Sequence, residues 1–455
     1  MPIRSFLLAA AMVGAPLAHA QPQASAPSLQ TQGLDSAIAT LADHGLDPAD
    51  YAAGTDRQRW MRAATHMLHG KLEPTSVEPD WTAKRRVRDL GALYDAHVAA
   101  GTLAGSLQEL APDQPGYRLM VDELRRLRLN ASAAPALLTA DRTLKPGMSG
   151  ADVGQLQVRL GIAASGLFDA DTEAAVRAFQ EASGLDVDGA VGPATRRALN
   201  RGDRERIDQL RVNMERWRWL PDDLGRRHLR ANIAGFTVTA YADGAPQRTH
   251  LTIVGKPFRK TPVFSDSVEY IVLNPWWETP HNLARLDKLP LFKRDPGAVQ
   301  RLGFQVLSGG QPVSNVDWNA IPAGTMPYRI RQAPGPTNAL GQVKIMFPNP
   351  HNVYLHDTPT RGLFAQRQRA FSSGCLRTQD PLDLSAWLLE ETPGWDAARI
   401  DATVQAGKET RVNLAEPVPV HILYFTVETD AGGVRYLDDI YDRDTKVLAG
   451  LNARR

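Results

Sequence analysis

The pattern of apolar and polar residues divides the chain into regions with different expected structures. Between residues 34 and 142, apolar side chains recur at helical spacing, as Leu34, Ile38 and Leu41 do on one face. Prolines should break this region into short helices, because a proline inside a helix removes a backbone hydrogen bond. These prolines are Pro74, Pro79, Pro112 and Pro115. The pattern predicts a helical scaffold domain without a chemical motif.

A second helical unit is expected between residues 143 and 200. Ser149 to Asp152 has the spacing of a capping box, and Gly161 should end the helix that follows. A second short helix should end at Gly184, and Pro193 should begin a third. This region therefore predicts a small module of three helices.

From Arg211 onward the apolar residues alternate with polar ones, which predicts a β-rich domain over residues 211–455. An Asp243-Gly244 turn should join two of its strands in a hairpin. The expected strands are 231–233, 236–241, 249–254, 270–273, 343–347 and 352–356.

A segment rich in proline and glycine, residues 276–342, interrupts the expected strands. It is too long and irregular for a plain connection, so we expect a cap or lid insertion beside a site, with a helix at 282–289. Its proline and glycine residues should prevent a packed sheet. Aromatic residues in the segment would offer stacking and exclude water. They are Trp276, Trp277, Trp318 and Tyr328.

The first twenty residues have the pattern of an export signal. Arg4 precedes an apolar run from Phe6 to Val13, and Ala18-His19-Ala20 has the small-x-small form of a cleavage site. The apolar run is shorter than the ~20 residues of a membrane span, and a retained N-terminal anchor is the alternative. We expect residues 1–20 to be a signal peptide and residues 21–33 a linker. The mature protein should be soluble outside the cytoplasm, without stable membrane insertion.

Composition and charge narrow the function classes. The chain has 43% hydrophobic residues, enough for several cores, and its 52 basic residues nearly balance its 50 acidic ones. That balance gives no electrostatic reason to expect nucleic acid as a partner. The local basic runs 84–88 and 125–128 lie among leucines at helical spacing, so we interpret both as solvated helix faces.

Cys375 is the only cysteine in the 455 residues and lies nineteen positions after His356. A lone thiol in an exported chain has no intramolecular disulfide partner, so its reactivity is the leading explanation for it. Residues 371–378 are expected to form a small-residue loop that leads into a helix capped by Asp380. A thiol near a helix N-terminus and an imidazole would have a lowered pKa and act as a nucleophile.

The neighbours of Cys375 suit an acyl transfer. His356 would take the thiol proton and later return one to the departing amine. Ser373 and Gly374 are small, so backbone N–H groups, that of Gly374 among them, could point at a developing oxyanion. An inert buried cysteine is the plainer alternative, but the Ser/Gly loop argues against it. A structural metal site would need three or four close ligands, and the other ten histidines are scattered singly, so we expect no metal and no cofactor.

At these residues the chain resembles the L,D-transpeptidase family, in particular its large periplasmic branch with a peptidoglycan-binding module ahead of the catalytic domain. The matching stretches are 213–221, 232–236, 254–257, 273–277, 354–359 and 372–377. The second helical unit also resembles the three-helix peptidoglycan-binding module, at residues 144–150, 178–180 and 188–195.

The resemblance implies a multidomain α+β protein: a helical scaffold (34–142), a peptidoglycan-binding domain (143–200) and a β-rich catalytic domain (211–455). It implies Cys375 as nucleophile, His356 as base and the backbone carbonyl of Asp357 as the group that holds the imidazole, with the Asp357 side chain as the alternative. The commoner family motif, His-Gly-Cys-x-Asn, differs here, because Ser373 and Arg377 stand at its first and last positions. The residues expected to bind substrate are Ser372, Ser373, Arg377, Tyr354, Trp276 and Trp277.

The implied reaction is an attack by Cys375 on the bond between diaminopimelate and the terminal D-Ala of a tetrapeptide stem. An amine of a second stem would resolve the thioester and give a 3→3 cross-link in the periplasm. Water or a lipoprotein lysine could serve as acceptor instead, and a non-catalytic wall-binding protein is a second alternative. A papain-like thiol peptidase should have its histidine after the cysteine, the reverse of the order here. The expected partners are donor and acceptor stems and other wall-synthesis enzymes.

Overall fold

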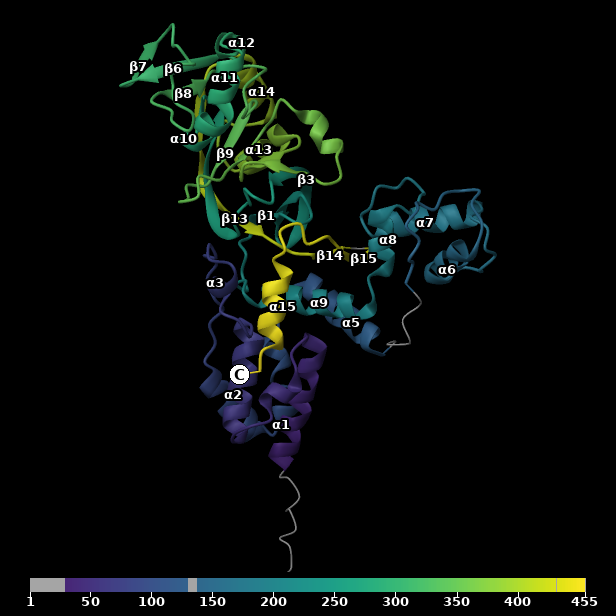
Figure 1. Ribbon diagram of the computed structural model, residues 1–455. Helices are drawn as coiled ribbons and strands as arrows, with labels where there is room; N and C mark the ends of the chain where they lie inside the picture. The colour runs from purple at the N-terminus through teal and green to yellow at the C-terminus, as the bar shows by residue number, and fades with distance from the viewer. Residues whose placement is uncertain (1–28, 130–136, 431, 455) are drawn as a thin grey trace, which may run out of the picture.

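The computed structural model describes residues 29–129, 137–430 and 432–454. The predicted signal peptide and most of the predicted linker lie outside the described residues. The described chain forms a helical scaffold, a small helical module and a larger β-rich domain, with the module beside the junction of the other two (Figure 1). The predicted multidomain α+β fold class is therefore confirmed. No helix within the described ranges is long and apolar enough to cross a membrane.

Short helices form the scaffold, as the prolines predict. Pro74 and Pro115 each occupy the first turn of a helix, where a missing N–H costs nothing. Leu34, Ile38 and Leu41 pack in one core with Trp60. The helices are α1 (Leu29–Thr40), α2 (Asp56–His69), α3 (Pro74–Val77), α4 (Leu90–Ala100) and α5 (Pro115–Leu129), with 3-10 turns η1 (Leu41–His44), η2 (Pro48–Tyr51), η3 (Leu103–Gly105) and η4 (Gln108–Leu110).

The two basic runs differ from each other in the structure. Residues 125–128 lie on α5, where Arg125, Arg126 and Arg128 are exposed and pair with carboxylates, as predicted. The prediction for residues 84–88 is wrong, because this run is not helical. Arg86 is buried and donates to the carbonyl oxygens of Leu110 (2.9 Å) and Met67 (3.1 Å). Its guanidinium therefore satisfies carbonyl groups at helix ends inside the scaffold.

The helical module has the three helices that its pattern predicts: α6 (Ala151–Leu160), α7 (Ala170–Ala182) and α8 (Pro193–Asn200). Gly161 ends α6 in the left-handed conformation, with φ of 70°. The predicted capping box is wrong. Gly150 is the N-cap residue, and Ser149 instead forms an isolated β-bridge with Leu167.

Helix α9 (Asp203–Arg218) connects the module to the β-rich domain. The predicted change to strand periodicity at Arg211 is therefore wrong. Leu210, Met214 and Trp217 recur at helical spacing and pack together against α5. The first strand begins only at Arg227.

Nine strands form the main sheet, in the order β11-β3-β12-β10-β9-β4-β13-β1-β2, and an additional β2–β3 pairing closes it on itself. The Asp243-Gly244 turn joins β2 to β3, as predicted, and both residues have positive φ. Helices α13 (Pro381–Leu389) and α14 (Ala397–Gln405) pack on its core. The strands are β1 (Arg227–Asn232), β2 (Thr237–Ala242), β3 (Ala245–Gly255), β4 (Phe264–Leu273), β9 (Val343–Met346), β10 (Leu355–His356), β11 (Ala370–Ser372), β12 (Leu376–Thr378) and β13 (Thr410–Leu423).

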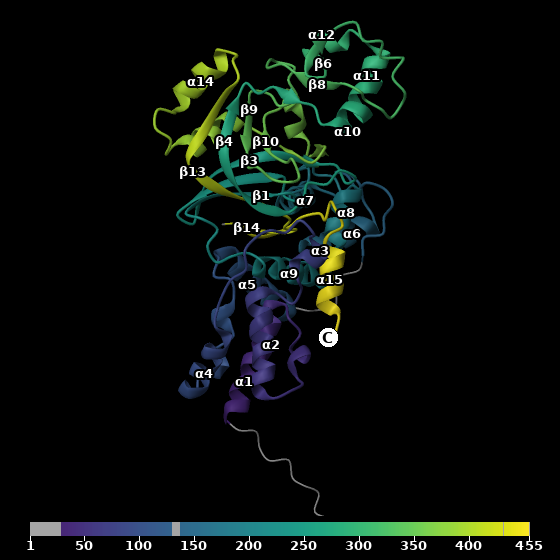
Figure 2. The same ribbon diagram turned by 90° about the vertical axis from the view of Figure 1, so that its left-hand side faces the viewer.

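The inserted segment 276–342 is a folded subdomain, which we call the cap. It lies on the side of the β-rich domain away from the scaffold (Figure 2). The prediction that proline and glycine prevent a packed sheet is wrong, because the cap contains a sheet. Gly309 and Gly310 lie in a turn between its strands, and Pro312 lies on an edge strand, where a missing N–H is tolerated. The predicted helix at 282–289 is present and longer. The cap elements are β5 (Trp277–Glu278), α10 (His281–Leu283), the π-helical η5 (Ala284–Lys288), α11 (Leu289–Arg294), α12 (Ala298–Arg301), β6 (Phe304–Ser308), β7 (Gln311–Val313) and β8 (Arg329–Gln332).

After β13 the chain returns to the scaffold. The hairpin of β14 (Val427–Asp430) and β15 (Gly433–Tyr436) packs on α5, and α15 (Asp444–Asn452) lies against α9 (Figure 1). Val447 and Leu451 of α15 share a core with Leu72 of the scaffold. The C-terminal helix thus fixes the β-rich domain to the scaffold.

A buried ion pair on α9 also fixes this junction. Glu215 and Arg218 have fully buried side chains, 3.0 Å apart. Glu215 accepts a hydrogen bond from the backbone N–H of Leu72 (2.8 Å), and Arg218 donates to the carbonyl oxygen of His44 and to the Tyr117 hydroxyl. Both charges are thus satisfied by scaffold groups, and the 213–221 stretch connects the two domains.

We expect Glu215→Ala to lower the free energy of unfolding by about 3–5 kcal/mol, because it leaves the Arg218 guanidinium buried without its partner. Glu205→Ala, an exposed change on the same helix, is the matched control and should have little effect. Guanidinium unfolding followed by tryptophan fluorescence measures both. Equal midpoints for the two variants would contradict this account of the junction.

Candidate active site

Cys375 lies in a bend between two short strands, β11 and β12, and its side chain is half-buried. Residues 371–378 were expected to be one loop leading directly into a helix. The structure corrects this, because β12 separates Cys375 from α13 and pairs with both β10 and β3. Asp380 precedes α13 with φ of 45° and makes no capping hydrogen bond. The helix N-terminus therefore does not activate the thiol.

His356 lies on β10, which pairs in parallel with β12, so that Leu355 faces Leu376 and His356 faces Arg377. Leu355 and Leu376 point into the core of the sheet. Since side chains alternate along strands, His356 and Arg377 point to the opposite face, toward the cap. Tyr354 and Cys375 both pack against the cap core, which places them on this face too.

The backbone of Asp357 orients the imidazole. Nδ1 of His356 lies 2.5 Å from the carbonyl oxygen of Asp357, and because a carbonyl only accepts, Nδ1 carries the proton. Nε2 of the neutral ring is then free to accept one. The Asp357 carboxylate has another use: it accepts from the backbone N–H of Gln342 (2.9 Å) and pairs with Arg361 (3.2 Å).

The catalytic loop is held by hydrogen bonds within itself. The Ser372 hydroxyl is buried, donates to the carbonyl oxygen of Cys375 (2.6 Å) and accepts from the N–H of Gly374 (3.1 Å). Gly374 has φ of 123°, which favours glycine, and its carbonyl accepts from the Thr261 hydroxyl. The Ser372 hydroxyl and the Gly374 N–H are therefore both hydrogen-bonded within the loop in this structure.

The surroundings of the thiol favour its neutral form. Burial raises the pKa of Cys375, while hydrogen bonds from the backbone and hydroxyl of Tyr354 and the charges of Lys344 and Arg377 oppose that rise. The thiol donates to the carbonyl oxygen of Asn352 at 3.6 Å. Burial and the Arg377 charge lower the pKa of His356 to about 3. The expectation of a lowered thiol pKa is wrong, and the resting pair is a neutral thiol beside a neutral imidazole.

We therefore expect the alkylation of Cys375 by iodoacetamide to accelerate steadily from about pH 7 to about pH 9, because a raised thiol pKa leaves little thiolate at neutral pH. Glutathione, alkylated under the same conditions, is the reference for an ordinary thiol. With one cysteine in the chain, mass spectrometry counts a single adduct. A rate that is already maximal near pH 6 would show a depressed pKa and contradict this prediction.

Ser373 connects the catalytic loop to the cap through Arg259. The exposed Ser373 hydroxyl accepts from the Arg259 guanidinium (2.9 Å), which also pairs with Asp287 of the cap (3.0 Å). This bridge was not predicted, because Arg259 has no sequence signal that separates it from other surface arginines. It joins the loop after β3, the catalytic loop and the cap.

The remaining predicted substrate-binding residues have different surroundings relative to Cys375. Arg377 is half-buried and donates to the Thr360 hydroxyl (3.3 Å). Trp277 is buried in the cap core and hydrogen-bonds the Tyr354 hydroxyl beside the thiol. Trp276 points to the other face of the cap sheet, where the Arg331 guanidinium lies 4.4 Å from its ring centroid.

Lys344 and Lys288 are functional candidates that sequence reasoning missed. Lys344 faces His356 across β9 and β10, and its Nζ lies 4.0 Å from the ring centroid of Tyr354. A lysine between Val343 and Ile345 in a buried strand was the available signal. Lys288 lies in the π-helical turn of the cap, a local form that often marks functional sites.

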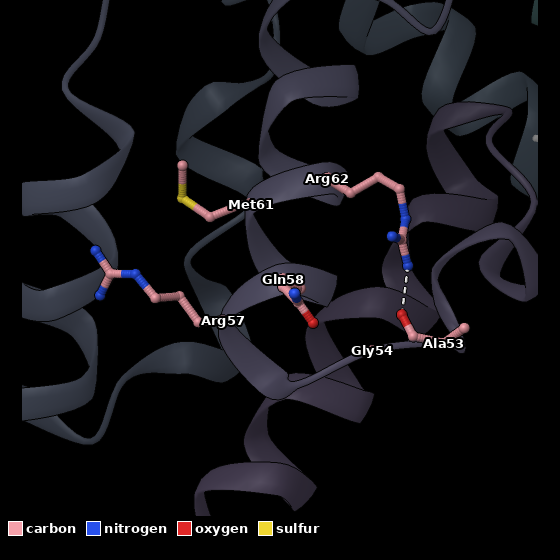
Figure 3. Close-up of a pocket in the computed structure, with 6 residues that line it drawn as sticks. All are labelled: Ala53, Gly54, Arg57, Gln58, Met61 and Arg62. Carbon is pink, nitrogen blue, oxygen red and sulfur yellow. Dashed lines mark hydrogen bonds between the residues drawn. The ribbon is translucent and has the colours of Figure 1, made fainter.

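A concave region lies on the scaffold, lined by none of the residues of the Cys375 site. Ala53, Gly54, Arg57, Gln58, Met61 and Arg62 line a shallow depression at the start of α2 (Figure 3). Arg62 donates to the carbonyl oxygen of Ala53 (2.6 Å) and Arg57 pairs with Asp95. The described part of the chain contains no group of three His, Cys, Asp or Glu side chains placed to hold a metal ion.

Family comparisons agree with this arrangement. Residues 226–405 match the L,D-transpeptidase catalytic domain, residues 149–199 match the "Putative peptidoglycan binding domain", and residues 58–124 match the "Scaffold domain". Residues 226–405 of the β-rich domain are therefore similar to L,D-transpeptidase catalytic domains, and residues 149–199 of the helical module are similar to the domain described as a putative peptidoglycan-binding domain.

One curated relative and several solved structures are similar to parts of the chain. A "Putative L,D-transpeptidase" of Haemophilus influenzae is 35% identical over 248 residues, which is 54% of this chain and 50% of that protein. The chain thus spans about half the length of this relative. A crystal structure of an L,D-transpeptidase from Xylanimonas cellulosilytica is 16% identical, with a TM-score of 0.20, covering 62% of this chain and 98% of that one. An L,D-transpeptidase from Mycobacterium smegmatis is 15% identical, with a TM-score of 0.22, covering 44% and 58%. The assignment rests on the family match and the Haemophilus relative.

Proposed function

We propose that this protein is a peptidoglycan L,D-transpeptidase of the periplasm that forms 3→3 cross-links through a thioester on Cys375. The observation that carries the proposal is that His356 lies on β10 and Cys375 directly precedes β12, the parallel strand beside it, on the face of the sheet that the cap covers. The matched catalytic domain supports the reaction class, and the matched wall-binding domain supports peptidoglycan as the substrate.

The neutral resting pair defines how the first step proceeds. As the sulfur of Cys375 attacks the diaminopimelate carbonyl of a tetrapeptide stem, the thiol proton passes to Nε2 of His356. The C–N bond to the terminal D-Ala then breaks, and the same proton goes to the departing amine. In the second step an amine of another stem attacks the thioester carbonyl and gives a proton to His356. The C–S bond then breaks, His356 passes the proton to the sulfur, and the new amide bond remains.

The oxyanion of each tetrahedral intermediate needs backbone donors that are not already used. The N–H of Gly374 is bonded to Ser372, whereas the N–H groups of Ser373 and Cys375 have no acceptor anywhere in the described ranges. We assign the oxyanion to these two groups. The Ser372 hydroxyl, which bonds both Gly374 and Cys375, fixes the loop that presents them.

Incubation of the purified protein with isolated tetrapeptide-rich muropeptides tests the proposal. We expect D-Ala release together with a product whose fragmentation places an amide between two diaminopimelate residues. A thioester adduct on Cys375 should be trapped by rapid acid quenching and intact-mass measurement. D-Ala release without cross-link would identify an L,D-carboxypeptidase, and binding without either product would leave a wall-binding protein.

A further inference from the structure

Three cationic side chains surround the catalytic pair. Lys344 and Arg377 flank His356 in one row across β9, β10 and β12. Lys288 comes from the cap, with its Nζ 5.1 Å from the ring centroid of Trp277, and Trp277 in turn bonds Tyr354 beside the thiol. Burial lowers the pKa of Lys288, and the positive charge of Arg377 lowers it further.

None of the three has an anionic partner among the described residues. All three are half-buried, and Arg377 has only the hydroxyl of Thr360. Two cations that are buried in the chain have carboxylate partners: Lys71 lies 2.6 Å from Asp50, and Arg216 lies 2.6 Å from Asp444. Holding unpaired cations away from water is costly, and here burial lowers the pKa of both lysines. The arrangement calls for an anion from outside the chain.

The carboxylates nearest to the three cations are used by other groups. Asp287 pairs with Arg259, and Asp357 with Arg361 and the N–H of Gln342. Glu409 raises the pKa of Lys344 but accepts from the N–H of Trp276 (2.8 Å). The ring contacts of Lys344 and Lys288 compensate the charges of both ammonium groups in part.

We propose that Lys288, Lys344 and Arg377 form a carboxylate receptor that binds the free C-terminal carboxylate of the donor stem. This inference rests on the proposed function, since the leaving D-Ala bears that carboxylate on the carbon next to the departing nitrogen. A receptor beside Cys375 would select stems that end at the residue to be released. Because Lys288 belongs to the cap, the bound carboxylate would also connect the cap to the sheet.

Ligand binding to a Cys375→Ala protein tests the receptor without turnover. The probes are a synthetic tetrapeptide stem that ends in D-Ala carboxylate and the same stem as a D-Ala amide. We expect the amide to bind about 10- to 100-fold more weakly, the range of a charge-assisted hydrogen bond. Lys344→Met and Lys288→Met, each added separately, should weaken the carboxylate probe toward the amide and leave the amide unchanged. Lys408→Met, an exposed lysine of the same domain, is the control.

Equal affinity of the two probes, or equal weakening of both by the Lys344 and Lys288 variants, would overturn the receptor. Lys344 could instead act by stabilising the Cys375 thiolate. The pH profile of Cys375 alkylation, measured in a Lys344→Met protein that retains Cys375, tests this role. A shifted profile together with unchanged discrimination between the two probes would also overturn the receptor. Failure of the proposed function would give a different result from failure of the receptor. Selective carboxylate binding with no thioester on the wild-type protein would reject the transpeptidase and retain the receptor.

Discussion

Replacing Cys375 with alanine should abolish D-Ala release and cross-linking, with a loss of at least about 10⁴-fold, because the covalent route has no other thiol in the chain. The protein should remain folded. Cys375 lies at the margin of the cap core, in a loop whose hydrogen bonds come from Ser372 and Thr261, and its own sulfur contributes one 3.6 Å contact to the Asn352 carbonyl.

The measurement pairs initial rates on purified muropeptides with thermal melting. Cys375→Ser is a second variant of nearly the same shape, and it should be as inactive as the alanine variant, because a hydroxyl beside a neutral imidazole is a poorer nucleophile than a thiol. Ser373→Ala, which changes a neighbouring exposed residue, should keep thioester formation. Turnover near the wild-type rate in the alanine protein would remove Cys375 from the mechanism.

The fold was predictable where local pattern and final structure agree. Helical spacing around Leu34 and Val176, the stop at Gly161 and the Asp243-Gly244 turn depend on short-range chemistry, and each is present. Helix α9 was missed because Asn213, Glu215 and Arg218 are polar in sequence but buried in the structure. Their partners, such as Thr426 and Leu72, lie far away in the chain, so no local pattern could reveal them.

The candidate site, like the fold, was predictable only where it depends on local sequence. The sequence order of His356 and Cys375 and the small residues around the thiol pointed to a catalytic loop, and the structure places both residues on one face. The direction of the thiol pKa was predicted wrongly, because it depends on burial under the cap and on β12, which separates the loop from α13. The Arg259 bridge and the cations Lys344 and Lys288 come from three separate segments. Only the pairing of strands and the docking of the cap bring them together.

Replacing His356 with alanine should slow thioester formation by roughly 10²–10⁴-fold, the usual contribution of a positioned general base. In the wild-type protein the pKa of His356 is lowered to about 3, so the imidazole stays neutral and available as a base from about pH 8 down to about pH 5. The wild-type rate should therefore show no loss near the ordinary histidine pKa. In the alanine variant only preformed thiolate can react.

The pH profile of the variant carries the decisive information. Since burial raises the pKa of Cys375, the rate of the alanine variant should climb about tenfold per pH unit up to about pH 9, whereas the wild-type rate should change much less. Stopped-flow acylation by a slowly hydrolysed β-lactam measures both proteins, and His97→Ala in the scaffold controls for loss of any histidine. If the two profiles run parallel at every pH, the proton is taken by another group, and the Asn352 carbonyl and Tyr354 hydroxyl become the first contacts to test.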